Sequence, residues 1–409
     1  MNKKALKEEK KKRIAERVKQ GTEQPPCPHF EQCGGCTYQT LTYEEQKLFK
    51  LEQVQSLIKP LLPNTVLKSC ESSPNRWEYR NKMEFSFGDE TKGGPLTLGL
   101  HKRSSFYDII NVEQCKIVPE DYRKILKRTR EYFTERKVPF FHKISHKGYL
   151  RHLMIRRGEV SGELLICLVT TSERNCDLHS YAKELLSLDL KGQISGILHM
   201  VNDRPSDMVA SDETIVLYGK NYFYEELLGL KFKISPFSFF QTNSSGAEVL
   251  YEKVREYIGG GIDNKVIFDL YSGTGTIAQV LARAAKKIVG IEIVEEAVLA
   301  ATENAQMNGL KNCTFITGDV RKVLDEVAER PDVIILDPPR EGVHPKALRK
   351  IADYHAKNVV YISCMPTSLV RDLEVFLDAG YQVKNAECVD MFPWTKNIET
   401  ICLLSKQCF

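Results

Sequence analysis

Cys364 and Glu399 are the side chains of this sequence best suited to nucleophilic and acid–base chemistry. Cys364 follows an apolar strand predicted over residues 359–362, so its thiolate could attack a substrate held outside the carboxyl end of that strand. The competing interpretation is a buried free thiol, a common fate of cysteine. Pro366 favours a helix whose N-terminus would lower the pKa of the thiol. Glu399 lies where a loop enters a strand, and alone it is typical of a surface glutamate.

A glycine-rich turn indicates a nucleotide-type ligand in the C-terminal half. The strand predicted over residues 266–271 runs into a turn at residues 272–276 and then a helix, so backbone N–H groups can approach a ligand. The next strand ends at Glu292, nineteen residues after Gly273, where a carboxylate can hydrogen-bond ribose hydroxyls. Two further strands end in acidic residues, Asp319 and Asp337.

The turn favours S-adenosylmethionine over a dinucleotide as the ligand. It reads GTGT and lacks the third glycine of the dinucleotide-binding G-x-G-x-x-G pattern. Asp337 opens an Asp-Pro-Pro sequence, in which each proline fixes φ and stiffens the loop beside the ligand. A nicotinamide-dependent dehydrogenase is therefore the weaker alternative to a methyltransferase.

Three cysteines near the N-terminus have a spacing suited to a metal centre. Cys27, Cys33 and Cys36 form C-x5-C-x2-C, and Gly34 and Gly35 permit a tight backbone there. A fourth thiolate must come from elsewhere, and four thiolates suit either a [4Fe–4S] cluster or Zn²⁺.

We expect the protein to be cytoplasmic, with reduced cysteines. The basic N-terminus has no apolar stretch behind it, and no apolar run approaches the ~18 residues that would span a membrane. Disulfides are rare in such a compartment, so the 12 cysteines are more plausibly thiols, ligands or a nucleophile.

Two kinds of strand pattern must position these residues. Residues 75–240 read as short, mainly antiparallel strands with a helix near 120–136, whereas after about 245 helices alternate with apolar strands, as in a parallel α/β sheet. The predicted organisation has four parts, which are a basic tail at 1–24, a cysteine-rich segment with a helix at 25–70, a mixed, mainly β central domain at 71–240 and an α/β domain at 241–409.

The positive charge of the chain is concentrated in its tail. Residues 1–19 hold nine Lys or Arg and three Glu, a net +6, so the other 390 residues sum to −2 against a total of +4. The tail is either a solvated helix or an arm that neutralises nucleic-acid phosphates.

Taken together, six sequence strings resemble the RNA (uracil-5-)-methyltransferases, the RumA/TrmA-like family. The resemblance covers residues 25–405 and implies a C-terminal class I S-adenosylmethionine-dependent methyltransferase domain with a Rossmann-like fold. The strings are SPFSFFQTN (235–243), DLYSGTGT (269–276), GIE (290–292), LDPPREG (336–342), SC-x-P (363–366) and DMFP…IET (390–400).

The resemblance implies the reaction and the roles of matching residues. Cys364 would attack C6 of a uridine, C5 would take the methyl group, and Glu399 would remove the C5 proton before elimination frees the thiolate. The residues that would contact S-adenosylmethionine are Gln241, Tyr271, Gly273, Thr276, Glu292, Asp319 and Asp337.

The resemblance also assigns the cysteine centre and the substrate. Iron–sulfur members of the family supply a fourth ligand from a position like Cys115, so a [4Fe–4S] cluster on Cys27, Cys33, Cys36 and Cys115 is expected, chiefly as a structural clamp. These cysteines favour 23S ribosomal RNA as the substrate, with a transfer RNA uridine as the alternative. We expect a monomer without a membrane partner.

The sequence departs from the family pattern at two motifs. Met365 replaces the usual Asn after the nucleophile, and Lys396 and Asn397 occupy a stretch that usually carries His. The small β-barrel RNA-binding module of many relatives is replaced by the basic tail. A non-catalytic RNA-binding relative therefore stays an alternative. An RNA cytosine-C5 methyltransferase is disfavoured, because the fourth strand ends in Asp-Pro-Pro-Arg without a cysteine.

Overall fold

The computed structural model describes residues 26–65, 67–173, 176–259 and 264–406, together with Glu9, Lys12 and Glu16. The chain forms two units. Unit 1 comprises Met1–Thr42, Asn75–Glu226 and Lys233–Pro236, and unit 2 comprises Tyr43–Pro74, Leu227–Phe232 and Phe237–Phe409. The basic tail predicted at 1–24 lies outside the described residues, apart from the three just named. None of the described helices is long and apolar enough to cross a membrane.

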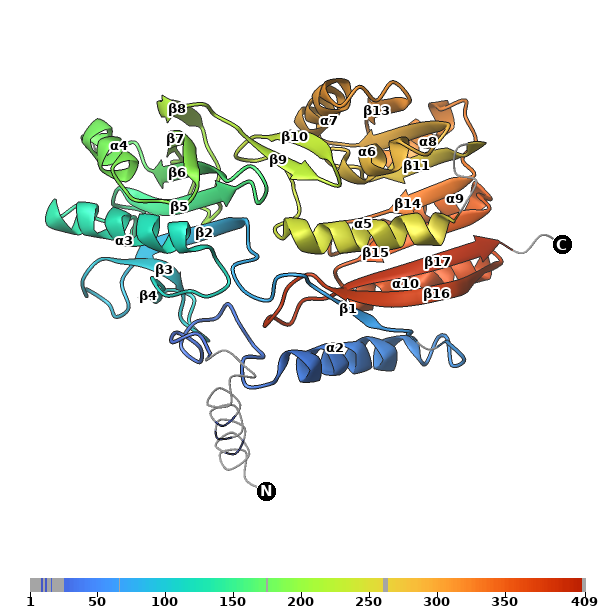
Figure 1. Cartoon of the computed structure of the whole chain (residues 1–409), viewed down its shortest axis with the longest axis horizontal. Coiled ribbons are helices and arrows are strands. Elements are labelled where there is room, and N and C mark those ends of the chain that lie inside the picture. The colour runs from blue at the N-terminus through green and yellow to red at the C-terminus, as the bar shows by residue number, and fades with distance from the viewer. Residues whose placement is uncertain are drawn as a thin grey trace. The chain divides into compact units, whose positions relative to one another are not determined.

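Unit 2 is built on an eight-stranded sheet (Figure 1). The strands follow the spatial order β1-β16-β17-β15-β14-β11-β12-β13. Their bounds are β1 Cys70–Ser72, β11 Val266–Leu270, β12 Lys287–Glu292, β13 Cys313–Thr317, β14 Val333–Leu336, β15 Asn358–Ser363, β16 Tyr381–Asp390 and β17 Glu399–Lys406.

The strands of this sheet are mostly parallel, as the alternation of helices and strands predicted. Strands β11 to β15 pair in parallel, and β17 runs antiparallel to both β15 and β16. The central strands β14 and β15 are continuous apolar runs, which suits a parallel sheet covered on both faces. The sheet reverses its strand order between β11 and β14, and ligands bind at the carboxyl edge of such a switch point.

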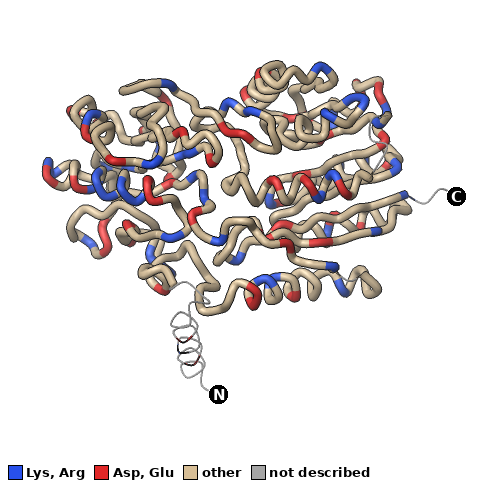
Figure 2. The backbone as a smooth tube through the Cα atoms, in the orientation of Figure 1, with Lys and Arg blue, Asp and Glu red and all other residues tan. Residues whose placement is uncertain are grey.

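Seven described helices belong to unit 2, and they cover its sheet. Their bounds are α2 Tyr43–Ile58, α5 Ser244–Ile258, α6 Thr276–Ala282, α7 Glu295–Met307, α8 Val320–Glu326, α9 Pro345–Asp353 and α10 Pro366–Asp378 in this order along the chain. Charged residues of both signs run along α5 in Figure 2, whereas β14 and β15 are uncharged.

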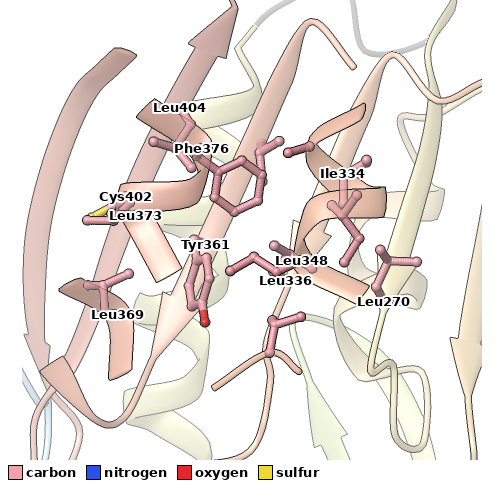
Figure 3. Packing of buried hydrophobic residues seen from close by; sticks show 14 of the residues in the cluster. Leu270, Ile334, Leu336, Leu348, Tyr361, Leu369, Leu373, Phe376, Cys402 and Leu404 are labelled. Atoms are coloured by element: carbon pink, nitrogen blue, oxygen red, sulfur yellow. The ribbon is translucent and has the colours of Figure 1, made fainter. Parts of the chain in front are cut away.

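The main core of unit 2 lies between one face of the sheet and the helices α2, α8, α9 and α10. Figure 3 shows side chains from α9 and α10 meeting those of the central strands. Leu348 of α9 and Phe376 of α10 are both at most 2% exposed in this core. Burial of such side chains contributes roughly 1.5–3 kcal/mol each, which holds the carboxyl ends of the strands in place.

Unit 1 contains a seven-stranded sheet in the order β4-β3-β2-β5-β6-β7-β8. Every neighbouring pair is antiparallel except β6 and β7, which confirms the mixed, mainly antiparallel pattern predicted for this part of the chain. The bounds are β2 Lys82–Gly88, β3 Thr97–His101, β4 Ile109–Asn111, α3 Glu120–Glu135, β5 Leu150–Arg157, β6 Glu163–Thr170, α4 Leu178–Leu186, β7 Gln193–Val201 and β8 Glu213–Gly219. A hairpin, β9 Phe223–Leu227 and β10 Leu230–Ile234, follows.

The division of the chain differs from the predicted boundaries. The helix α2, expected within the cysteine-rich segment at 25–70, groups with the α/β unit together with the strand β1, and so do residues 227–232 and 237–240 of the predicted central domain. The reason is β pairing, because Cys70 of β1 is the register partner of Cys388 in β16. The cysteine-bearing residues before Thr42 stay with the β strands of unit 1.

Candidate active site

The turn after β11 has a backbone conformation that requires glycine. Gly273 and Gly275 have φ of 53° and 70°, and Tyr271 has a φ of 66°. A Cβ on Gly275 would lie 2.5 Å from the ring of Phe315, so the position excludes a side chain on two counts. Gly275 is the N-cap of α6, and the buried Thr276 is its first residue. The turn therefore brings the start of α6 close to the sheet, as the sequence predicted.

Glu292 is fixed against this turn by its own carboxylate. Oε2 accepts the N–H of Gly273 at 3.0 Å, and Oε1 accepts the N–H of Val294 at 3.0 Å. Each oxygen keeps a second lone pair, so the carboxylate can still accept hydrogen bonds from a pair of ribose hydroxyls.

Asp319 lies at the next strand end and has a structural role there. Its carboxylate caps α8 by accepting the N–H of Arg321 at 2.9 Å and also pairs with the Arg321 guanidinium. These bonds lower the pKa of Asp319 to about 2, so it is ionised. Burial raises the pKa of Tyr271 to about 12, and the negative charge of Asp319 adds to this shift. Both side chains therefore lie at one edge of the site.

Gln241 reaches the same region from the segment before α5. Its side chain hydrogen-bonds the hydroxyl of Tyr251, a buried residue of α5 that the sequence analysis missed. Burial raises the pKa of Tyr251 well above its usual value, and the nearby charge of Asp337 adds to that effect. In the sequence, Tyr251 lies on the apolar face of a predicted helix. This pattern does not distinguish a core tyrosine from one that faces a ligand.

Two buried carboxyl groups, those of Asp269 and Glu399, and the half-buried carboxyl group of Asp337 lie at the carboxyl edge of the sheet. Burial raises the pKa of Asp337 to about 7, and burial together with Asp337 raises that of Asp269 to about 8. Burial raises the pKa of Glu399 well above its usual value, and Asp337 again contributes. A ligand with a positive charge would relieve this repulsion, whereas the anionic pyrophosphate of a dinucleotide would increase it.

Asp269 is the second residue that the sequence analysis passed over. Its Oδ2 accepts the N–H of Ala278 in α6 at 3.1 Å. Its buried Oδ1 has no hydrogen-bond partner among the described residues. A buried polar atom without a partner costs about 1–3 kcal/mol, so this oxygen is suited to receive a donor from a ligand.

Cys364 and Glu399 lie at the same end of two neighbouring strands. Cys364 follows the last residue of β15, and Glu399 is the first residue of β17. The pair Ser363 and Thr400 are register partners in the antiparallel ladder, so Cys364 and Glu399 occupy the next positions. Glu399 is 4% exposed, whereas Cys364 is half-buried and reachable.

The thiol of Cys364 is less acidic than the sequence suggested. Burial, with a contribution from Glu399, raises the pKa of Cys364 to about 11. The helix α10 does begin directly after it, with Pro366 in its first turn, but the expected lowering is outweighed. Burial and the neighbouring carboxyls both disfavour the thiolate, which is the physical reason for the difference.

Arg340 opposes these effects. Its guanidinium hydrogen-bonds Cys364 and lowers the pKa of Cys364, and its charge lowers that of Glu399. In the sequence, Arg340 was noted only as part of the Asp-Pro-Pro-Arg string. Its position directly after a rigid proline pair could have indicated a cation held at the site.

Met365 takes part in the site through its backbone. Its carbonyl oxygen accepts hydrogen bonds from the hydroxyls of Ser363 at 3.0 Å and Ser368 at 2.9 Å. Met365 is also the N-cap of α10, although its side chain makes no capping hydrogen bond. The replacement of Asn by Met at this position therefore leaves the backbone geometry around Cys364 in place.

The four predicted ligand cysteines line one cavity in unit 1. Cys27, Cys33, Cys36 and Cys115 share it with His29 and Gln39. Burial raises the pKa of Cys36 and that of Cys115 to about 12, and the other cysteines of the set add to both shifts. Arg103 donates to the carbonyl oxygens of Cys33 at 3.2 Å and Cys36 at 2.5 Å, which fixes the loop.

The donor set limits what this cavity could hold. The part of the chain that the structure describes has no group of three or more His, Cys, Asp or Glu side chains that could hold a metal ion. Zn²⁺ gathers its thiolates around one centre at about 2.3 Å, whereas a [4Fe–4S] cluster binds each thiolate through a different iron. The thiols that line the cavity are the donor type that both groups use.

The doubly wound sheet and the acidic site at its carboxyl edge define a class I S-adenosylmethionine-dependent methyltransferase. The model of the family described as tRNA (Uracil-5-)-methyltransferase matches residues 43–407. The chain belongs to this family, the RumA/TrmA-like RNA uracil-5-methyltransferases, and it is an RNA methyltransferase.

Relatives and a solved structure agree with this assignment. The chain is 50% identical over 382 residues to an uncharacterized RNA methyltransferase of Clostridium tetani, covering 93% of this chain and 84% of the relative. It is 35% identical over 386 residues to another from Halalkalibacterium halodurans, covering 93% and 82%. The crystal structure of Pyrococcus abyssi tRNA (uracil-54, C5)-methyltransferase with S-adenosyl-L-homocysteine is similar at a TM-score of 0.75 and 26% identity, covering 91% and 86%.

Proposed function

We propose that this enzyme methylates C5 of a uridine in RNA, with Cys364 as the nucleophile and Glu399 as the base. The observation that carries the proposal is the placement of these two residues beside each other at the ends of β15 and β17. Arg340 hydrogen-bonds the thiol, and the charge of the half-buried Asp337 raises the pKa of both groups. A non-catalytic RNA-binding relative would need neither the reachable thiol nor the buried base.

The residues divide the reaction into two easier steps. The Cys364 thiolate adds to C6 of the uracil, which places the electron pair of the C5–C6 double bond on C5. S-adenosylmethionine supplies the methyl group that C5 takes. Glu399 then accepts the C5 proton, the double bond re-forms, and the electron pair of the C6–S bond returns to Cys364. A general base typically contributes about 10²–10⁴-fold.

The carboxyl groups at this edge of the sheet support the assignment of the methyl donor. Asp337 repels both Asp269 and Glu399, and a sulfonium and an ammonium group would each favour the ionised forms of these carboxyl groups. Glu292 would hold the ribose, and Gln241 and Tyr271 would lie at the sides of the same ligand. An ionised Glu399 with a raised pKa is a strong proton acceptor.

We further propose that Cys27, Cys33, Cys36 and Cys115 hold a [4Fe–4S] cluster with a structural role. The support is the common cavity and the mutual electrostatic influence of the four thiols. The cluster would tie the loop before α2 to the segment that follows β4.

The identity of the RNA is the finer part of the proposal. The four cysteines support ribosomal RNA, whereas the Pyrococcus abyssi enzyme, a tRNA methyltransferase, supports transfer RNA as the second candidate. Methyl transfer from labelled S-adenosylmethionine to separate pools of unmodified large-subunit rRNA and tRNA tests both. Label in rRNA as 5-methyluridine supports the first, label in tRNA the second, and label in neither contradicts the proposed activity.

A further inference from the structure

A buried ion pair joins α2 to the end of β16. Lys50 Nζ donates to Asp390 Oδ1 at 2.6 Å, and both side chains are 0% exposed. Lys50 Nζ also donates to the carbonyl oxygen of Phe392 at 3.1 Å. The Lys50 ammonium group therefore binds the residues on both sides of Met391 in the sequence, Asp390 and Phe392.

Two further residues on the same face of α2 contact the segment that follows. Gln46 Oε1 accepts the N–H of Trp394 at 2.9 Å, and the rings of Tyr43 and Trp394 lie 5.8 Å apart. The positions 43, 46 and 50 have the i, i+3, i+7 spacing of one helix face. All three are buried, although a helix normally buries apolar side chains on such a face.

The segment so held, residues 391–398, carries a strained backbone. Trp394 is 3% exposed and has a φ of 68°, in the left-handed region that side chains other than glycine rarely adopt. Such a conformation persists when surrounding contacts determine it. From the opposite side, Asn243 Nδ2 donates to the carbonyl oxygen of Met391 at 2.7 Å.

This segment decides where Glu399 lies. It joins Asp390, the last residue of β16, to Glu399, the first residue of β17. Val389 and Glu399 are register partners, so the ladder begins immediately beside the segment. A shift of the segment would move the start of β17 and its carboxyl group relative to Cys364.

We propose that Lys50, assisted by Gln46, is a positioning residue that fixes the 391–398 segment and thereby sets Glu399 for proton abstraction. The inference rests on the proposed function, because it assigns Glu399 the role of base. Lys50 acts through Asp390 and Phe392 and contacts neither RNA nor methyl donor in this role.

A purely structural role makes a different prediction. Replacing a buried ion pair with apolar residues of similar volume is often neutral or stabilising, whereas removing one partner leaves a buried charge. The double variant Lys50→Met/Asp390→Leu should therefore unfold near the wild-type temperature, while Lys50→Met alone should unfold at a lower one. The double variant lacks the bonds from Lys50 to Asp390 and Phe392, so its segment is held less firmly, by Gln46 and Asn243 alone among the hydrogen bonds described above.

The experiment measures the lifetime of the covalent enzyme–RNA adduct in a single turnover, together with kcat, the KM for S-adenosylmethionine and the unfolding midpoint. The RNA substrate is the pool, rRNA or tRNA, that accepts the labelled methyl group from S-adenosylmethionine. The adduct is released only after proton removal, so in the folded double variant it should persist about 10- to 100-fold longer and kcat should fall equally. The KM should stay unchanged. Lys59→Met, an exposed lysine beside the end of the same helix, is the control.

A folded double variant with wild-type kcat and adduct lifetime would overturn the proposal. If the double variant does not fold, Gln46→Met keeps the ion pair and removes the acceptor for Trp394; a wild-type adduct lifetime there overturns it as well. Absence of any adduct in the wild-type enzyme overturns the proposed chemistry itself, which is a distinct result.

Discussion

Cys364 and Glu399 lie one position beyond the register pair Ser363 and Thr400 of the β15–β17 ladder. The pairing of two neighbouring strands therefore brings nucleophile and base to the same edge of the sheet, and the 391–398 segment fixes the start of one of these strands. Sites on regular elements are positioned more accurately than sites on loops.

Replacement of the nucleophile should abolish covalent chemistry. Cys364→Ala removes the atom that bonds C6, so methylation should fall by at least about 10³-fold and 5-fluorouridine RNA should no longer be trapped on a denaturing gel. Cys313→Ala, which changes another half-buried cysteine of unit 2, is the control and should retain trapping. Trapping by Cys364→Ala would contradict the assignment.

Replacement of the base should stop the reaction after methyl transfer. Glu399→Gln keeps the shape but cannot accept the C5 proton, so kcat should fall about 10²–10⁴-fold and a methylated adduct should accumulate. Mass spectrometry of the digested adduct checks this. Glu374→Gln, at an exposed position of α10, should behave as the wild type. Normal turnover of Glu399→Gln would exclude Glu399 as the base.

Arg340 should control the acidity of the nucleophile. The pKa of Cys364 is about 11, so its alkylation rate should rise with pH throughout the range of about 7 to 10 as the thiolate fraction grows. Arg340→Met removes a cation that lowers this pKa, so the rate should fall at every pH in that range. Peptide mass spectrometry quantifies the modification, and Arg349→Met is the control. An unchanged profile would contradict the role of Arg340.

The turn after β11 should not tolerate a side chain at Gly275. Gly275→Ala adds strain at positive φ, about 1–3 kcal/mol, and a clash with Phe315, so S-adenosylmethionine binding should weaken and the protein should unfold earlier. Gly309→Ala is a matched control, because Gly309 has a φ of 68° but nothing within 4 Å of the added Cβ. Calorimetry should show normal binding for the control, and equal effects of both variants would refute the steric argument.

Loss of one thiol should release the metal of the cysteine centre. Cys36→Ser removes a proposed ligand that lines the shared cavity, so bound iron, visible absorbance and the unfolding temperature should all fall. Cys313→Ser, in the other unit, should leave them unchanged. Zinc instead of iron in the wild-type protein, measured by elemental analysis, would contradict the cluster.

Local patterns predicted the elements of the site but not its electrostatics. The apolar strands and the turn of Gly273 and Gly275 follow from short stretches of sequence, so their form could be predicted. The pKa of Cys364 could not, because it depends on burial and on Glu399, 35 positions away. Tyr251 and Asp269 were missed for the same reason, since their function depends on neighbours that only the fold brings near.

The pairing of β1 with β16 has a consequence for synthesis of the protein. Cys70 and Cys388 are register partners across 318 residues, so unit 2 is not complete until nearly the whole chain has left the ribosome. Contacts between such distant residues form slowly, because a long loop must close first. Most of unit 1 is one uninterrupted stretch, Asn75–Glu226, and can fold earlier during translation. In the interval, Val54 and Ile58 of α2 lack the later strands and helices against which they are buried in the finished protein.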